Sequence, residues 1–186
     1  MGKLLKTPGS KPNKIGNSRD LVSGATVTTG NKVVTGDAPI REESAIYGMR
    51  WLGVPKSVSS KIGSVYDVII FSHKGITKKS VDVLAGYLGI SKKNMAEKIF
   101  DVSIKTLERK EDAARLDRKT SSHALEIAKV VQHAYEIFQN EEKVRQWLNR
   151  ENKALNNMKP VDLFDTLTGL NTVNDILGRI EEGVYS

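Results

Sequence analysis

The sequence of 186 residues contains no cysteine. A disulfide framework and a thiolate metal site are therefore both excluded. Long apolar runs are also missing: the opening MGKLLKTPGSKPNKIG holds no seven consecutive apolar residues, and no eighteen follow one another anywhere. Because signal peptides and membrane-spanning helices need such runs, we expect a soluble, cytoplasmic protein with no membrane partner.

Motifs for catalysis and cofactor binding are absent too. The sequence has no GxxxxGK[ST] or GxGxxG phosphate loop and no GxSxG nucleophile turn. Three histidines, His73, His123 and His133, stand without an HExxH motif or a carboxylate at metal-ligand spacing. The neighbouring Glu181 and Glu182 point in different directions on a helix, so they make a poor acid and base pair. These absences predict a protein that is not an enzyme and that uses no metal or cofactor.

What the sequence does have is uneven charge. Residues 1–120 carry 22 Lys and Arg against 12 Asp and Glu, whereas residues 121–186 carry 7 against 10. A basic front and an acidic back favour two surfaces for two partners, the first a polyanion. Ordinary solubility charge is the simpler explanation of the composition alone.

The first 40 residues mix Gly, Ser, Thr and Lys with few large apolar side chains. Such a segment buries too little surface to offset the entropy of ordering, so we predict a largely disordered basic arm over residues 1–40. Within it, ATVTTGNKVVTG sets Thr and Val runs around Gly30-Asn31, which is a hairpin signal, although a single hairpin is marginal in water.

Helical periodicity begins near residue 41, and no strand pattern interrupts residues 77 to 183. Three short helices stand in tandem over ITKKSVDVLAGYLGI, SKKNMAEKIF and VSIKTLERKE, with Thr77, Ser91 and Ser103 as N-caps. The segment SSHALEIAKVVQHAYEIF has the strongest helical pattern in the chain. The sequence thus predicts an all-α protein with domains over residues 41–120 and 121–186.

Three further helices complete the C-terminal part. The first follows Asn140 over NEEKVRQWL, with Trp147 in its buried stripe. The second begins at Pro160 and buries Val161, Leu163 or Phe164, and Leu167. The last opens at TVNDILGRIEEG, where Thr172 and Asp175 have the spacing of a capping box.

The tandem SKKNMAEKIFDVSIKTLERKE has the pattern of a helix-turn-helix whose second helix carries cations at its start and end. Such a helix reads the major groove, while phosphate contacts supply most of the affinity. The DNA-binding candidates are Ser103, Lys105, Thr106, Arg109 and Lys110. Alternatively, these side chains form the solvated face of an ordinary short helix. Phe100 stands where such turns prefer glycine, and the turn is one residue longer than usual, which weakens the DNA interpretation.

Four motifs of the C-terminal third carry a specific resemblance. They are F-x-N-x-E-K-x-x-x-W-L from Phe138, N-x-A-L from Asn152, P-x-D-L-x-D-T-x-x-G from Pro160, and L-G-R-I-E-x-G-V-Y from Leu177. On these motifs residues 134–186 resemble the toxin-binding domain of Xre/MbcA/ParS-type antitoxins, the partners of RES-domain toxins. Residues 65–120 resemble the Xre-like helix-turn-helix that precedes that domain, and the first 40 residues have no counterpart in the family.

The resemblance implies an antitoxin of a type II toxin-antitoxin system. Its N-terminal helical domain would help it form a homodimer or higher oligomer and repress its own operon at operator DNA. Its C-terminal domain would occlude the active site of a RES-domain toxin that consumes NAD. The rival from another class is a free-standing helix-turn-helix transcription regulator with a C-terminal oligomerisation domain. A third possibility is an antitoxin whose first domain no longer reads DNA.

In that family the extreme C-terminus lies against the toxin's active-site entrance. The resemblance therefore implies toxin contacts for Arg179, Glu182, Gly183, Val184, Tyr185 and Ser186. Gly183 would end the helix, so that Val184 and Tyr185 form an apolar anchor and the Ser186 carboxylate meets a cationic site. Alternatively, the tail folds back and Tyr185 covers the bundle. Arg179 either pairs with a toxin carboxylate or favours the negative end of its own helix.

Overall fold

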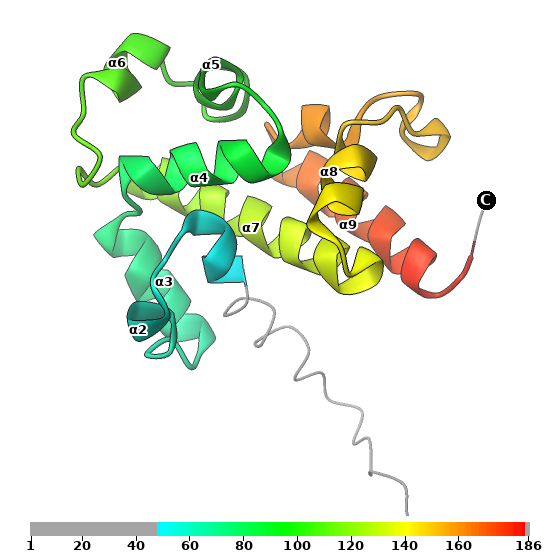
Figure 1. The fold of residues 1–186 in the computed structure, drawn as a ribbon, viewed down its shortest axis with the longest axis horizontal. Coiled ribbons are helices and arrows are strands. Elements are labelled where there is room, and N and C mark those ends of the chain that lie inside the picture. The colour runs from blue at the N-terminus through cyan, green and yellow to red at the C-terminus, as the bar shows by residue number, and fades with distance from the viewer. Residues whose placement is uncertain (1–47, 185–186) are drawn as a thin grey trace, which may run out of the picture. The chain divides into compact units, whose positions relative to one another are not determined.

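The computed structural model describes residues 48–184, which fold into helices joined by short connections (Figure 1). Within this range there is no β-strand, and the two isolated β-bridges join Thr77 to Arg115 and Asn152 to Met158. The all-α prediction is confirmed. The predicted basic arm and the predicted hairpin at Gly30-Asn31 lie outside the described residues, as do Tyr185 and Ser186.

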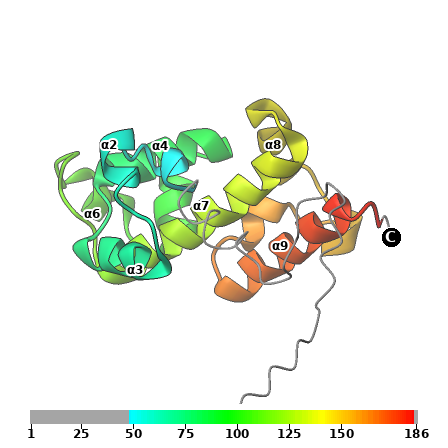
Figure 2. The same ribbon diagram turned by 90° about the horizontal axis from the view of Figure 1, so that it is seen from below.

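The longest helix, α7 (Arg118–Phe138), is the element on which both ends of the described chain pack. The carboxylate of Asp117 caps it by accepting a hydrogen bond from the Thr120 N–H at 3.0 Å. Leu125, Ala128 and Val131 are buried along it, as its periodicity predicts. Helices α3 (Val65–Lys74) and α9 (Leu167–Glu181) both contact α7, as Figure 2 shows from below.

Two short N-terminal elements, η1 (Gly48–Leu52) and α2 (Lys56–Ser59), precede α3. The side chain of Trp51 is fully buried, and its Nε1 donates a hydrogen bond to Gln132 Oε1 of α7 at 2.8 Å. The rings of Tyr87 and Tyr135 meet the indole edge-on at 4.8 and 5.5 Å. The 3-10 turn at the start of the described chain is therefore part of the core.

The three tandem helices are present as α4 (Lys78–Leu88), α5 (Lys92–Asn94) with its π-helical continuation η2 (Met95–Ile99), and α6 (Ile104–Glu108). Thr77 and Ser91 cap α4 and α5 as predicted, accepting from the Ser80 and Asn94 N–H groups at 3.3 and 3.1 Å. Ser103 is the N-cap residue of α6 as predicted, but its hydroxyl makes no cap hydrogen bond. The Thr106 N–H is already bonded to the Ser103 carbonyl, at 2.9 Å.

The C-terminal elements are α8 (Glu141–Leu148), η3 (Lys153–Leu155), η4 (Pro160–Leu163) and α9. Asn140 caps α8 as predicted, accepting from the Lys143 N–H at 3.0 Å. The side-chain amide of Asn149, just after α8, donates to the Leu88 carbonyl at the end of α4, at 2.7 Å. This bond joins the C-terminal elements to the helix-turn-helix region.

The predicted start of the last helix is wrong. Helix α9 begins at Leu167, five residues before Thr172, and Thr166 caps it by accepting from the Gly169 N–H at 3.0 Å. Thr172 lies inside the helix, where its hydroxyl bonds back to the Thr168 carbonyl at 2.9 Å. As a residue of the first turn, Leu167 is 60% exposed instead of buried, whereas Phe164 is fully buried.

Gly169 explains why the helix begins there. A Cβ at this position would lie 2.0 Å from the Leu163 carbonyl oxygen, so only glycine lets the first turn of α9 approach η4 this closely. The contact fixes where the last helix leaves η4.

In the described part of the chain, no helix is long and apolar enough to cross a bilayer.

Candidate functional site

The first candidate surface lies on α6. Leu107 is buried, with 4% of its surface exposed, and Ile104 is half-buried beside it. The five DNA-binding candidates are all exposed: Ser103, Lys105, Thr106, Arg109 and Lys110. Helical spacing places Lys105 on the side of α6 away from Leu107. Thr106 and Lys110, by contrast, line a hollow together with Leu107, and Arg109 and Lys110 follow the last residue of α6.

The turn before α6 corrects the expectation about Phe100. Phe100 has ordinary helical backbone angles and a buried side chain that meets the His123 ring edge-on at 5.6 Å. The left-handed residue of the turn is Asp101, with φ of 54°. Aspartate is one of the few residues other than glycine that tolerate this conformation. Phe100 is therefore a core residue of the turn and no obstacle to its geometry.

Cations near α6 divide into paired and unpaired groups. Lys78 donates to Asp112 at 2.7 Å and Lys92 donates to Asp82 at 2.8 Å. The first bond raises the pKa of Lys78 and lowers the pKa of Asp112, because each charge stabilises the other. By contrast, none of the three α6-region cations Lys105, Arg109 and Lys110 forms a salt bridge with another residue of the range 48–184. Their charges are available to an anionic partner.

The second candidate surface is the end of α9. Gly183 adopts a left-handed conformation with φ of 72°, and the Val184 N–H bonds to the Arg179 carbonyl at 2.9 Å. This is the glycine-terminated helix end that the sequence predicts. Arg179, Glu182 and Val184 are exposed, with 55% of Val184 accessible to solvent. Gly183 therefore ends α9, and the hydrogen bond of the Val184 N–H holds the chain there against the last turn of the helix.

A hollow of about 250 Å³ borders this helix end. It is lined by Trp147 of α8, by Asn152 and Ala154 around η3, and by Ile176, Arg179, Ile180 and Val184 of α9 and its end. The Trp147 ring packs on Phe138 with centroids 5.7 Å apart, and the residue is only half-buried. The prediction that Trp147 packs in the core is therefore met only in part, because the residue also lines the hollow. Helical spacing within α8 carries no signal for the hollow, because α9 is distant in sequence.

Two histidines connect α7 to the C-terminal elements. His123 Nε2 lies 2.7 Å from the Phe164 carbonyl oxygen, and His133 Nδ1 lies 2.8 Å from Asn174 Oδ1. His133 also lines a groove of about 560 Å³ between α7 and α9, whose walls carry the carboxylates of Glu126, Glu136, Asp175 and Glu181. Among residues 48–184, no three His, Cys, Asp or Glu side chains form a cluster that could hold a metal ion.

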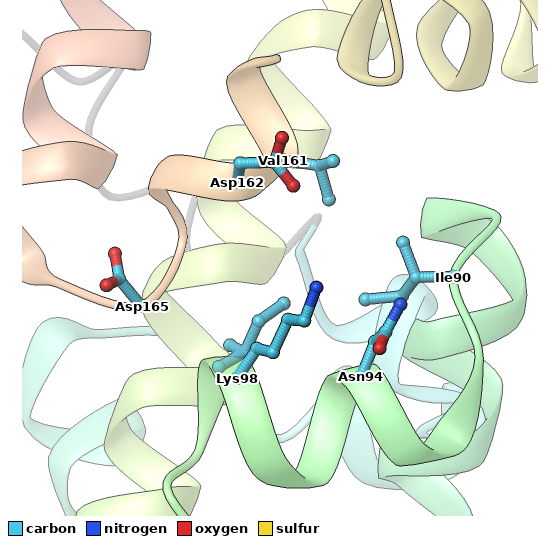
Figure 3. Close-up of a pocket in the computed structure, with 7 residues that line it drawn as sticks. Ile90, Asn94, Lys98, Val161, Asp162 and Asp165 are labelled. Carbon is cyan, nitrogen blue, oxygen red and sulfur yellow. The ribbon is translucent and has the colours of Figure 1, made fainter. Parts of the chain in front are cut away.

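A further cleft, of about 380 Å³, separates α5 and η2 from η4 (Figure 3). Asn94 and Lys98 point into it from the helix-turn-helix side, while Val161 and Asp162 face them from η4. No salt bridge joins Lys98 to Asp162 or Asp165. The cleft therefore lies between the helix-turn-helix region and the C-terminal elements.

Comparisons with known proteins match both regions. Residues 67–129 match the antitoxin Xre-like helix-turn-helix domain, and residues 133–183 match the antitoxin Xre/MbcA/ParS C-terminal toxin-binding domain. Antitoxin Xre of Photorhabdus laumondii subsp. laumondii is 23% identical over 139 residues, which make up 74% of this chain and 89% of that relative. Both domain matches include residues of α7, and the division at residues 120 and 121 stays a prediction.

A helix-turn-helix domain followed by a toxin-binding domain is the architecture of an antitoxin. The chain belongs to the Xre/MbcA/ParS-type antitoxins, and α7 contributes residues to both domain matches.

Proposed function

We propose that this chain is the antitoxin of a type II system, that it occludes the active site of an NAD-consuming RES-domain toxin, and that it represses its own operon. The observation that carries the proposal is the pair of domain matches, which place a helix-turn-helix and a toxin-binding domain side by side in one chain. An antitoxin of this kind acts by binding and needs no catalytic group. It works in the cytoplasm, where toxin and operator DNA are found.

The proposed toxin contacts are Arg179, Glu182, Gly183, Val184, Tyr185 and Ser186. Support comes from the exposed helix end, where Gly183 ends α9 and 55% of Val184 is accessible to solvent. The test is co-expression with the toxin encoded in the adjacent reading frame, with growth and cellular NAD as readouts. Removal of the residues after Gly183 is expected to abolish rescue while complex formation persists. A truncated chain that still rescues growth contradicts occlusion by the tail.

The proposed DNA contacts are Ser103, Lys105, Thr106, Arg109 and Lys110. Their exposure on and directly beside α6 supports this role, as does the lack of salt bridges to Lys105, Arg109 and Lys110 within residues 48–184. Replacing Lys105 and Arg109 by alanine is expected to weaken binding to a fragment of the chain's own promoter and to make it less dependent on salt. Replacing Lys56, an exposed cation of α2, serves as the control.

We also propose that two copies associate through α3. Four large apolar side chains of α3 are exposed, and so is Val58 of α2. Their exposed fractions are 45% for Val65, 78% for Tyr66, 45% for Ile69, 52% for Ile70 and 41% for Val58. A face of this kind usually marks an interaction site, and helix-turn-helix proteins commonly bind two half-sites as dimers. Ile69→Glu is expected to give a monomer in analytical ultracentrifugation, whereas Lys74→Glu leaves the assembly unchanged.

The rival function, a free-standing transcription regulator, predicts a different result from the co-expression test. Such a protein would bind its promoter fragment without rescuing cells from the adjacent toxin. The match of residues 133–183 to a toxin-binding domain favours the antitoxin.

A further inference from the structure

The hollow beside the end of α9 has the features of a protein-binding pocket. Its lining includes the apolar side chains of Trp147, Ile176 and Ile180, together with the guanidinium of Arg179. Tryptophan and arginine are enriched among the residues that dominate binding energy at protein interfaces. Its volume of about 250 Å³ is below the range of about 300 to 1,000 Å³ that holds typical small ligands. The hollow therefore suits side chains of another protein better than a free metabolite.

The electrostatics of the hollow limit the choice of partner. Arg179 is exposed, and it forms no salt bridge with any residue in the range 48–184. An arginine at the edge of an apolar pocket favours a carboxylate beside the apolar group that enters it, because the paired charges form strong hydrogen bonds. The partner segment that fits combines a bulky apolar side chain with a nearby Asp or Glu.

The position of the hollow connects it to the proposed toxin contacts. Arg179 and Val184 line it, and Glu182 and Gly183 lie between them in the sequence. Ala154 of η3 also lines the hollow and is exposed, so a larger side chain at this position would extend into it. A toxin that contacts the end of α9 would thus meet the hollow as part of the same surface.

We propose that this hollow, with Trp147 as its wall and Arg179 at its edge, is a second anchoring pocket for the toxin, which inserts a bulky apolar side chain flanked by a carboxylate. The proposal rests on the proposed antitoxin function. It gives Trp147 a direct part in binding and separates two tasks: the tail after Gly183 blocks the active site, and the hollow supplies affinity.

The test fills the hollow without removing any core contact. Ala154→Trp places an indole in it, and the dissociation constant for the purified toxin of the adjacent reading frame is measured by isothermal titration calorimetry with the full chain. We expect affinity to fall at least about tenfold, since hot-spot pockets carry much of the binding energy. Ala113→Trp makes the same substitution at an exposed position between α6 and α7 and is expected to leave affinity within about twofold.

Charge variants test the contribution of Arg179 to the pocket. Arg179→Glu is expected to weaken toxin binding more than Arg179→Lys, because lysine keeps the charge and glutamate reverses it. Unchanged affinity of Ala154→Trp overturns the pocket while the antitoxin function stands. Tighter binding also overturns it, because it means that the chain's own tail occupied the hollow. A wild-type chain that fails to bind the toxin overturns the proposed function and the pocket together.

Discussion

The helices that carry the two candidate surfaces are held in different ways. Helix α6 has five residues, one buried side chain, Leu107, and an N-terminus without a side-chain cap. Helix α9 has fifteen residues, is capped by Thr166, and buries five residues along its length. Isolated helices shorter than about 12 residues are marginal in water. Helix α6 therefore depends on a few tertiary contacts, whereas α9 has a cap and a continuous buried stripe.

This difference matches the tasks proposed for the two surfaces. DNA presents a regular array of phosphates, and α6 with the two residues that follow it carries three cations that lack salt bridges within the described range. A helix held by few contacts can adjust to the groove at small cost. The proposed entry of the tail into the toxin's active site would instead require a Gly183 turn that keeps its direction. The cap and the buried stripe of α9 suit that task.

The largest effect is expected where α9 meets η4. Gly169→Ala would place a Cβ 2.0 Å from the Leu163 carbonyl oxygen, a backbone atom that cannot rotate away. We expect the free energy of unfolding to fall by about 3 kcal/mol, the upper end for overpacking. Urea denaturation followed by circular dichroism measures it.

The control for this prediction is Gly178→Ala in the same helix, where no atom lies within 4 Å of the new Cβ. Alanine should stabilise α9 there by about 0.5 to 1 kcal/mol. Equal effects of the two substitutions would mean that the close contact with η4 does not determine the position of α9.

The next effect concerns α6. Leu107→Ala removes its one fully buried side chain, and we expect a loss of about 2 kcal/mol, the low end for such substitutions because a short helix can relax into the space. Hydrogen exchange of the α6 amides should accelerate while that of α9 stays unchanged. Equal acceleration in both helices would show that α6 does not open independently, and the contrast between the two regions would fail.

Several elements could be predicted from the sequence because their signals are local. The caps Thr77, Ser91 and Asn140 each precede a helix whose apolar spacing is regular, and all three form the expected hydrogen bonds. Local signals fail where two candidates compete. Thr166 and Thr172 are both plausible caps, and the close contact of Gly169 with Leu163 favours the first.

The candidate sites were predictable only in part, for a physical reason. Exposure of Lys105 follows from helical spacing, and the turn at Gly183 follows from the left-handed conformation that glycine adopts at helix ends. The hollow joins Trp147 to Arg179 and Val184 across two helices, and no periodicity within one helix encodes such a contact. The burial of Trp51 was missed for the same reason, since its hydrogen-bond partner Gln132 is 81 residues away.

A smaller effect separates the true cap of α9 from the predicted one. Thr166→Ala removes the hydroxyl that accepts from the Gly169 N–H and should cost about 1 kcal/mol. Thr172→Ala is the matched control: this residue is exposed inside the helix, where alanine is the better helix former, so stability should hold or rise slightly. Thermal denaturation of both variants ranks their stabilities. A greater loss of stability for Thr172→Ala would support the capping box predicted at Thr172.

The smallest effect is a pH dependence at the start of α7, the helix that both regions share. Burial alone would raise the pKa of Asp117, but hydrogen bonds from the Thr120 N–H and hydroxyl outweigh it and bring the pKa below its ordinary value. A lowered pKa stabilises the fold above about pH 4, and this contribution is lost as the pH falls through the folded-state pKa. Asp117→Asn keeps a capping oxygen but removes the charge at the positive end of the helix dipole, so we expect it to be less stable by about 0.5 kcal/mol at pH 7. Urea denaturation of both proteins should show this gap closing as the pH falls below about 4. A gap that stays constant over this range would mean that the Asp117 charge makes no contribution to holding α7.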